Sequence, residues 1–311
     1  MNRSRAGLAR DLLVRSFLML LYLFTLATHF WLTCVGARRR RLQVGEISLV
    51  YYTLGPRNGE PWVLLHGLGS VGATWGEVLF RLRRDCRLIV PELSVFGGSK
   101  IPGGGLDVRN GVEVISALIE KEHGRRPVTV AGLSLGGWLA VRLALRRPDL
   151  VGRLVLVNSG GYREQDWDTI ESLVRVEDMA GVDRLYGAMF ARTPWIMRLS
   201  RAGFFQAYTS PAVTGILERL SEEDTFTDDD LRQLRMPTSL IWGEHDGIFR
   251  ADCARAMAEA LPNGTLEVLE GCGHAIHLEC PDRLAEAMQR ARRTTAPLHA
   301  SAVPDGAPSS L

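Results

Sequence analysis

The feature that most constrains this chain is a serine flanked by glycines, placed between an apolar run and a helical pattern. Residues 128–131 read VTVA, residues 132–136 read GLSLG, and a helical pattern follows from near Trp138. A continuous apolar run is typical of a strand that is buried on both faces. Because a strand that turns at once into a helix leaves space only for small flanking residues, we expect a sharp, strained turn with Ser134 at its tip.

Ser134 is therefore a candidate nucleophile, and an ordinary turn serine is the alternative. A serine hydroxyl reacts only when a base takes its proton, and the base in turn needs an acid that orients it. The following helix begins at once, so the backbone N–H of Leu135 is expected to point at the reacting oxygen. Leu135 is accordingly a candidate donor of an oxyanion hole.

Two later strand ends supply candidates for the acid and the base. The run SLIW at residues 239–242 is followed by GEHD, which makes Asp246 the candidate acid and Glu244 the alternative. The run LEVLE at residues 266–270 is followed by GCGH, which makes His274 the candidate base and His277 its competitor. A short glycine loop after a strand leaves a histidine free to face the serine.

A fourth loop, HGLG at residues 66–69, follows the strand-like run WVLL. A loop in this position can supply a second oxyanion donor, and the backbone N–H of Leu68 is the candidate. Such a donor contributes about 3 kcal/mol of transition-state stabilisation in a comparable enzyme. We expect His66 to hold this loop through hydrogen bonds rather than to act on a substrate.

Along the rest of the chain, short apolar runs alternate with helical patterns. This alternation predicts an α/β fold with a mostly parallel central sheet and helices on both of its faces. It stops between residues 161 and 235, where apolar residues recur at helical spacing, and an insertion of helices between two strands predicts a cap. The expected strands are residues 47–52, 62–65, 88–90, 128–131, 154–157, 239–242 and 266–269.

The chain is expected to divide into five segments. They are an N-terminal membrane anchor with basic flanks (residues 1–41), the first part of the core (42–160), a helical cap inserted before the last two strands (161–235), the second part of the core (236–293) and a tail rich in Ala, Ser and Pro (294–311). The composition of the tail predicts disorder.

The anchor is predicted from residues 16–37, which contain no Asp, Glu, Lys or Arg. As a helix this run would extend about 33 Å, which matches a hydrocarbon core of about 30 Å. Arg15 precedes it and four arginines at residues 38–41 follow it, so positive charge on both sides leaves the orientation open. The alternatives are a cleaved signal peptide, with Val35-Gly36-Ala37 as its site, and a buried core helix.

Composition excludes several classes of protein. With 46% hydrophobic and 23% charged residues and a net charge of +2, the chain is globular and shows no basic stripe that would bind nucleic acid. The five cysteines form no Cys-x-x-Cys pair, so neither a structural zinc site nor a disulfide framework is expected. Cys272 and Cys280, on either side of His274, are expected to be small buried thiols.

Together these motifs resemble the α/β-hydrolase superfamily over about residues 45–290. HGLG, GLSLGG, IWGEHD and GCGHAIHLECP occur in the order and spacing found in that superfamily. Within it, the chain resembles monoacylglycerol lipases and related bacterial lipases that carry an N-terminal hydrophobic anchor; the similar features are the uncharged run followed by arginines, NSGG, MPTSLIWG and GCGH. The resemblance implies a nucleophile at Ser134, an acid at Asp246 and a base at His274. It also implies oxyanion amides at Leu68 and Leu135, and no metal or organic cofactor.

One loop departs from the superfamily pattern. Residues 91–99 read PELSVFGGS, and they resemble the usual Pro-Asp-Leu-Pro-Gly-x-Gly-x-Ser. Glu92, Ser94 and Val95 stand where the pattern has Asp, Pro and Gly. The departure affects the expected shape of this loop and leaves the triad unchanged.

The resemblance implies acyl transfer to water, because relatives that use other chemistry carry Asp in place of Ser134. The leading hypothesis is a carboxylic ester hydrolase that acts on a lipid-like or small ester, such as a monoacylglycerol, at a membrane. The alternatives are a hydrolase of a C–C bond in a ring-cleavage product, which would use the same triad, and a ligand-binding homologue without catalysis. The sequence assigns no oligomeric state.

Overall fold

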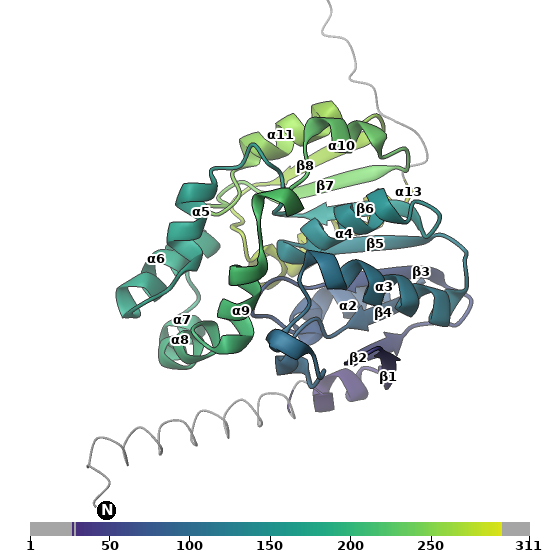
Figure 1. Ribbon diagram of the computed structural model, residues 1–311, viewed down its shortest axis with the longest axis horizontal. Helices are drawn as coiled ribbons and strands as arrows, with labels where there is room; N and C mark the ends of the chain where they lie inside the picture. The colour runs from purple at the N-terminus through teal and green to yellow at the C-terminus, as the bar shows by residue number, and fades with distance from the viewer. Residues whose placement is uncertain (1–26, 28, 294–311) are drawn as a thin grey trace, which may run out of the picture.

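The computed structural model describes residue 27 and residues 29–293. Eight strands form one central sheet in the order β1-β2-β4-β3-β5-β6-β7-β8 (Figure 1). β1 pairs antiparallel with β2 and β2 antiparallel with β4, whereas all later pairs are parallel. The strands are β1 (Arg38–Val44), β2 (Ile47–Leu54), β3 (Glu60–Leu65), β4 (Cys86–Pro91), β5 (Val128–Leu133), β6 (Val151–Val157), β7 (Thr238–Gly243) and β8 (Gly264–Leu269).

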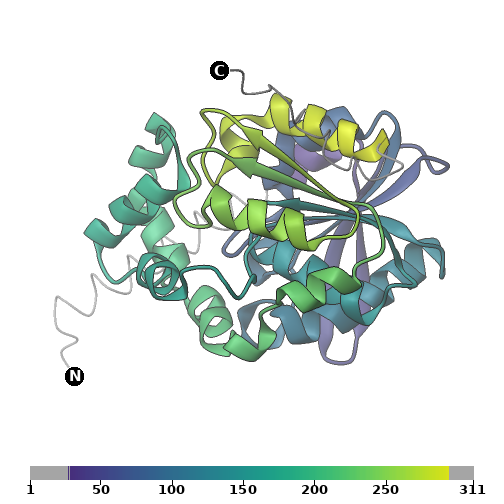
Figure 2. The same ribbon diagram turned by 90° about the horizontal axis from the view of Figure 1, so that it is seen from above.

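Both faces of the sheet are buried, which explains the continuous apolar runs in the strands. In β6, Leu154 and Leu156 belong to the core on one face, and Val155 and Val157 belong to the core on the other. Figure 2 shows the helices on both sides of the sheet. One core includes residues of α3 (Val108–His123), α4 (Leu135–Arg146), α10 (Asp228–Gln233) and α11 (Ala251–Ala260), and the other includes residues of α2 (Gly76–Leu82), α12 (Ile276–Glu279) and α13 (Pro281–Arg293).

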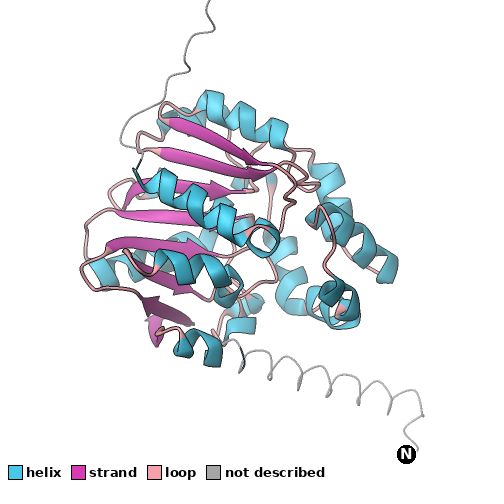
Figure 3. Cartoon of the chain, turned by 180° about the vertical axis from the view of Figure 1, so that it is seen from behind, coloured by secondary structure: helices cyan, strands magenta, loops and turns pink. Residues whose placement is uncertain are grey.

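Six α-helices lie between β6 and β7 in the sequence, and the first five of them lie beyond the carboxyl ends of the parallel strands in space (Figures 1 and 3). Local signals start several of them: the side chains of Asp166 and Asp178 accept hydrogen bonds at two helix N-termini, and Pro211 opens a third. We call these five helices the cap. They are α5 (Trp167–Val174), α6 (Met179–Met189), α7 (Trp195–Leu199), α8 (Arg201–Tyr208) and α9 (Pro211–Arg219).

Short 3₁₀ helices complete the connections. They are η1 (Gly72–Trp75), η2 (Val95–Gly97), η3 (Pro102–Gly104) and η4 (Glu222–Asp224).

The sequence pattern predicts a basic flank outside the folded core for the four arginines at residues 38–41. This prediction was wrong, because they make up most of β1. Arg40 pairs with Tyr51 of β2, and its guanidinium lies 3.5 Å from the carboxylate of Glu122. Since β1 is an edge strand, its exposed positive charges disfavour pairing with another chain. The sheet therefore begins before residue 42.

Residues 29–34, which precede β1, are helical and pack on the core. Leu32 is only 1% exposed, and the guanidinium of Arg83 donates to the carbonyl of Val35 at 2.7 Å. Within the described residues, no helix has both the length and the apolar character that a membrane span requires. Residues 16–26 and 28 of the expected anchor, and the expected tail at residues 294–311, lie outside the described residues, so both stay predictions.

Candidate active site

The predicted turn at Ser134 is present between β5 and α4. Ser134 has φ 55° and ψ −119°, a conformation that a residue with a side chain adopts only under strain. A Cβ atom on Gly132 would lie 2.2 Å from the carbonyl oxygen of Gly136, and one on Gly136 would lie 2.3 Å from that of Leu65. The two glycines are therefore required for the close approach of strand, turn and helix.

Asp246 and His274 are brought together from the loops after β7 and β8. The Nδ1 atom of His274 lies 2.8 Å from Oδ2 of Asp246, and both residues are buried. Oδ1 of Asp246 accepts from the backbone N–H groups of Ile248 and Phe249, both at 2.8 Å. Because a carboxylate can only accept, Nδ1 carries the proton, which leaves Nε2 of His274 as a proton acceptor.

Glu244 and His277, the alternatives to Asp246 and His274, do not take part in this contact. Glu244 is 47% exposed, and its carboxylate accepts from the backbone N–H of Gly271 at 2.9 Å. His277 is buried with its ring 6.1 Å from that of Trp75, and its Nδ1 has no hydrogen-bond partner among the described residues. Burial lowers the pKa of His277 to about 3, so it is neutral at physiological pH. The structure thus pairs Asp246 with His274.

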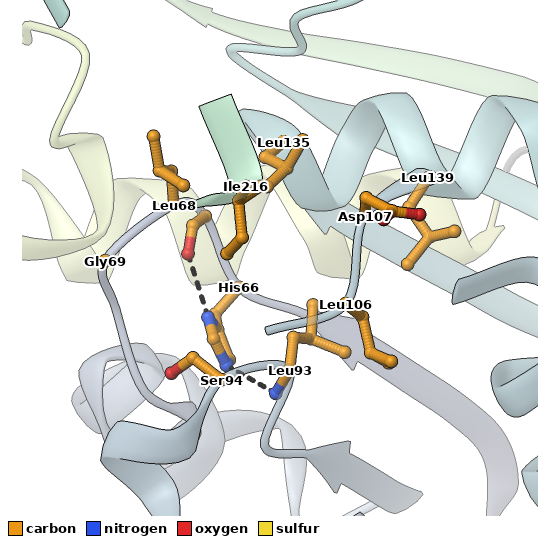
Figure 4. Close-up of a pocket in the computed structure, with 11 residues that line it drawn as sticks. His66, Leu68, Gly69, Leu93, Ser94, Leu106, Asp107, Leu135, Leu139 and Ile216 are labelled. Atoms are coloured by element: carbon orange, nitrogen blue, oxygen red, sulfur yellow. Dashed lines mark hydrogen bonds between the residues drawn. The ribbon is translucent and has the colours of Figure 1, made fainter. Parts of the chain in front are cut away.

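Ser134, Leu68, Leu135 and His274 line one cavity. The backbone N–H groups of Leu68 and Leu135 donate to no other group in the part of the chain that the structure describes. Figure 4 shows Leu68 and Leu135. Because α4 begins at Leu135, the positive end of its helix dipole faces the cavity that contains Ser134. The two amides predicted as oxyanion donors are therefore free and adjacent to the serine.

His66 holds the loop that carries Leu68. Its Nδ1 lies 2.9 Å from the carbonyl oxygen of Gly67, and the backbone N–H of Leu93 donates to its Nε2 at 3.0 Å (Figure 4). Because Nε2 accepts a proton from an amide, Nδ1 must be the protonated nitrogen that donates to Gly67. Burial lowers the pKa of His66 to about 4, so the ring is neutral and acts as a fixed hydrogen-bond bridge.

Glu92, one of the three residues that depart from the superfamily pattern, lies behind this loop. It is buried, and its Oε2 accepts from the backbone N–H of Gly72 at 2.9 Å. Its own carbonyl oxygen accepts from the hydroxyl of Ser99 at 2.7 Å. Burial raises the pKa of Glu92 to about 7, although the hydrogen bond from Gly72 and the charge of Arg39 oppose the rise.

The cavity above Ser134 has a volume of about 1230 Å³, and the cap and the core both contribute to its walls. Among the apolar residues between positions 161 and 235, Met189 and Phe204 line the cavity, whereas Phe190 is buried in the core and Trp195 is 72% exposed on the surface. Most of the lining is apolar, and its charged members all have exposed side chains. These are Arg163, Glu171, Arg175 and Glu222.

Sequence reasoning was wrong about Cys272 and Cys280, which form a disulfide rather than two thiols. The bond joins the loop of His274 to the start of α13. Nothing in the sequence indicated this bond, because five cysteines without regular spacing do not show which two are paired. The free thiols are those of Cys34, Cys86 and Cys253. Within the described residues, no group of His, Cys, Asp or Glu side chains is arranged to hold a metal ion.

Two further residues at the site had no clear signal in the sequence. Glu279 accepts from the backbone N–H of Gly273 at 2.7 Å and from that of Arg192 in the cap at 3.1 Å. Asn158, directly after β6, contacts the loops of Asp246 and His274. Only NSGG, which follows the strand LVLV, marked the position of Asn158.

Known proteins share this architecture. A 2-hydroxymuconate semialdehyde hydrolase of Pseudomonas putida is 30% identical over 253 residues, which cover 74% of this chain and 86% of the relative. The monoacylglycerol lipase ABHD6 of Rattus norvegicus is 24% identical, over 83% of this chain and 82% of the relative. The crystal structure of a membrane phospholipase A has a TM-score of 0.74 at 23% identity and covers 94% of this chain and 100% of its own.

The family model described as the alpha/beta hydrolase family matches residues 62–287. This range contains the serine turn, the loop of His66 and the paired Asp246 and His274. The chain therefore belongs to the alpha/beta hydrolase family.

Proposed function

We propose that this protein is a serine hydrolase that cleaves carboxylic esters of lipid-like compounds, such as monoacylglycerols, through an acyl-enzyme. The observation that carries the proposal is that Ser134 and His274 open into one large cavity with mostly apolar walls. Relatives described as lipases, including a lipase of Psychrobacter immobilis that is 24% identical over 77% of this chain, support an ester substrate.

The geometry supports a two-step reaction. Nε2 of His274 takes the proton of Ser134 as Oγ attacks the ester carbonyl carbon, and the backbone N–H groups of Leu68 and Leu135 stabilise the negative oxygen that forms. His274 then gives this proton to the leaving alcohol as the acyl-enzyme is formed. In the second step, His274 activates a water molecule that releases the acid and restores Ser134.

A C–C hydrolase is the second candidate, because the relative in Pseudomonas putida is named as a hydrolase of 2-hydroxymuconate semialdehyde. A muconate is a carboxylate, and a buried carboxylate needs a cationic or hydrogen-bonding partner. The described arginines of the cavity lining are Arg163 and Arg175, both exposed, and Arg175 is paired with Glu171 at 2.5 Å. The apolar wall favours a neutral acyl chain.

Covalent labelling tests the nucleophile. We expect a fluorophosphonate probe to label the protein at Ser134, and Ser134→Ala to abolish both labelling and ester hydrolysis. Ser70→Ala is the matched control, since Ser70 lines the same cavity and should leave labelling intact. Labelling that persists at another serine in Ser134→Ala would show that the nucleophile is misassigned.

A series of acyl chains tests the cavity. Each buried methylene contributes up to about 0.8 kcal/mol, so four of them can raise kcat/KM by roughly two orders of magnitude. We expect kcat/KM for monomeric esters of one alcohol to rise from acetyl to butyryl and octanoyl. A flat or falling series, or a higher kcat/KM for a ring-cleavage product, would favour the second candidate.

Two glycines in the cap allow this test to be localised. Gly203 lines the cavity, whereas Gly187 does not, and a Cβ atom on either would meet nothing within 4 Å. We expect Gly203→Trp to reduce kcat/KM for octanoyl esters more than for acetyl esters. Gly187→Trp should leave kcat/KM unchanged for both esters. An equal loss at every chain length in Gly203→Trp would contradict an acyl chain bound beside α8.

Membrane association is a further part of the proposal and rests on the uncharged residues 16–37. Leu32 and Ala37, near the end of that run, are buried against the domain, so residues 29–37 would have to leave these contacts in order to span a bilayer. Flotation with phospholipid vesicles should carry the full chain but not a chain that begins at residue 27. Equal behaviour of the two would contradict anchoring by this run.

A further inference from the structure

Asn158 is the first residue after β6, the strand that lies between β5 and β7 in the sheet. Its side chain is fully buried, and its φ of 42° is one of two positive values among the described residues other than glycine, the other being that of Ser134. Asparagine tolerates this conformation better than most residues with a side chain. A fully buried amide in this strained conformation indicates that its hydrogen bonds, rather than packing, require asparagine at this position.

The side-chain amide of Asn158 connects two loops. Its Oδ1 accepts from the backbone N–H of Gly243, at the end of β7, at 2.8 Å. Its Nδ2 donates to the carbonyl oxygens of Gly273 and His274 at 3.1 and 2.8 Å. Both donors and the acceptor of the amide are therefore used, and they join the segment leading to Asp246 to the loop that carries His274.

This pattern of contacts restricts the residue type. Aspartate has the shape of asparagine but cannot donate when ionised, so it would place a negative oxygen against two carbonyl oxygens. Glycine would accept the backbone conformation but would remove all three side-chain hydrogen bonds. Among side chains of this size, an amide is required to accept from one loop and donate twice to the other.

We propose that Asn158 is a positioning residue that sets the alignment of His274 with Asp246 by fixing the loops after β7 and β8 to each other. The inference rests on the catalytic roles proposed above for Ser134, Asp246 and His274. The pair of Asp246 and His274 comes from two separate loops, so its 2.8 Å contact holds only while those loops keep their relative position. A displacement of about 1 Å at such a site can reduce the rate about 100-fold.

The test compares Asn158→Asp and Asn158→Gly with Asn263→Asp in the full-length protein. Asn263 is a matched control because its side-chain amide also donates to a backbone carbonyl oxygen, that of Arg235, at 2.7 Å. Asn263 directly precedes β8, so it lies at the opposite end of that strand from His274. For each variant, kcat, KM, the rate of fluorophosphonate labelling at Ser134 and the thermal unfolding curve are measured.

We expect both Asn158 variants to remain folded and to lose about 10- to 100-fold in kcat and in labelling rate, with KM within about twofold. The activity of Asn158→Asp relative to the wild type should rise as the pH falls, because a protonated carboxyl group can again donate. Asn158→Gly should show no such recovery, and Asn263→Asp should match the wild type.

Other outcomes would overturn the inference. Equal labelling rates in the wild type and both Asn158 variants would exclude a positioning role while leaving the nucleophile intact. Unfolding of both variants would make Asn158 a determinant of folding instead. Absence of labelling at Ser134 in the wild type is a different result, since it would refute the proposed function on which the inference depends.

Discussion

Replacing Glu92 by Gln removes a titratable group that is buried behind the loop of His66 and leaves its hydrogen bond possible. The side-chain oxygen of glutamine can still accept from the backbone N–H of Gly72, as Oε2 of Glu92 does at 2.9 Å. Glutamine has nearly the same volume, so no cavity is created. The substitution therefore tests the charge of Glu92 with little change in packing.

The magnitude follows from the pKa. Burial raises the pKa of Glu92 from 4.5 to about 7, so between these values the folded state holds a proton that the unfolded state releases. The free energy of unfolding of the wild type should therefore fall as the pH rises through this window. At 1.36 kcal/mol per pH unit, the full destabilisation above pH 7 is about 3 kcal/mol, and below pH 4.5 it is absent.

Denaturant unfolding from pH 4 to pH 8 is the assay. His66 works in the opposite direction, because its pKa is lowered to about 4 and its contribution to stability increases as the pH rises. Because both proteins contain His66, its contribution is removed when the free energy of unfolding of the wild type is subtracted from that of Glu92→Gln. We expect the two proteins to be equally stable near pH 4 and the variant to be more stable by about 3 kcal/mol at pH 8.

Glu46→Gln serves as the control, since Glu46 is exposed in the turn between β1 and β2. It should leave the pH dependence of stability unchanged. A constant difference between the wild type and Glu92→Gln across the pH range would refute the reasoning, because it would show that the proton of Glu92 is not linked to folding. A variant less stable than the wild type at pH 8 would show that the ionised carboxylate stabilises this loop.

Three other predictions concern the acid, the disulfide and β1. Asp246→Asn should fold normally and lose about 10⁴-fold in kcat, whereas Glu244→Gln should retain most of its activity; the reverse result would assign the acid to Glu244. Reduction of the Cys272–Cys280 bond, which closes a loop with a sequence separation of 8, should lower the free energy of unfolding by about 2.5 kcal/mol, and an unchanged denaturation midpoint would contradict this. A chain that begins at residue 42 should unfold at a lower temperature than one that begins at residue 27, because it lacks most of β1 and the buried Leu32.

Local features of the sequence were sufficient to predict the fold and the residues of the candidate site. The strands of a mostly parallel sheet are buried on both faces, so they appear as apolar runs, and the glycines at residues 132 and 136 mark the turn because no larger residue fits there. The carboxyl ends of parallel strands meet at one edge of the sheet. The candidates after β5, β7 and β8 lie at this edge, and their catalytic roles stay predictions until labelling tests them.

The tertiary structure decided what depends on contacts between distant segments. Hydrogen bonds between loops pair His274 with Asp246 rather than with Glu244, and they give Asn158 and Glu279 their partners. The same holds for the disulfide and for the arginines of β1. A sequence pattern records the period and the turns of each element, but the partner of a loop side chain is set by how the elements pack, and that packing is a property of the whole chain.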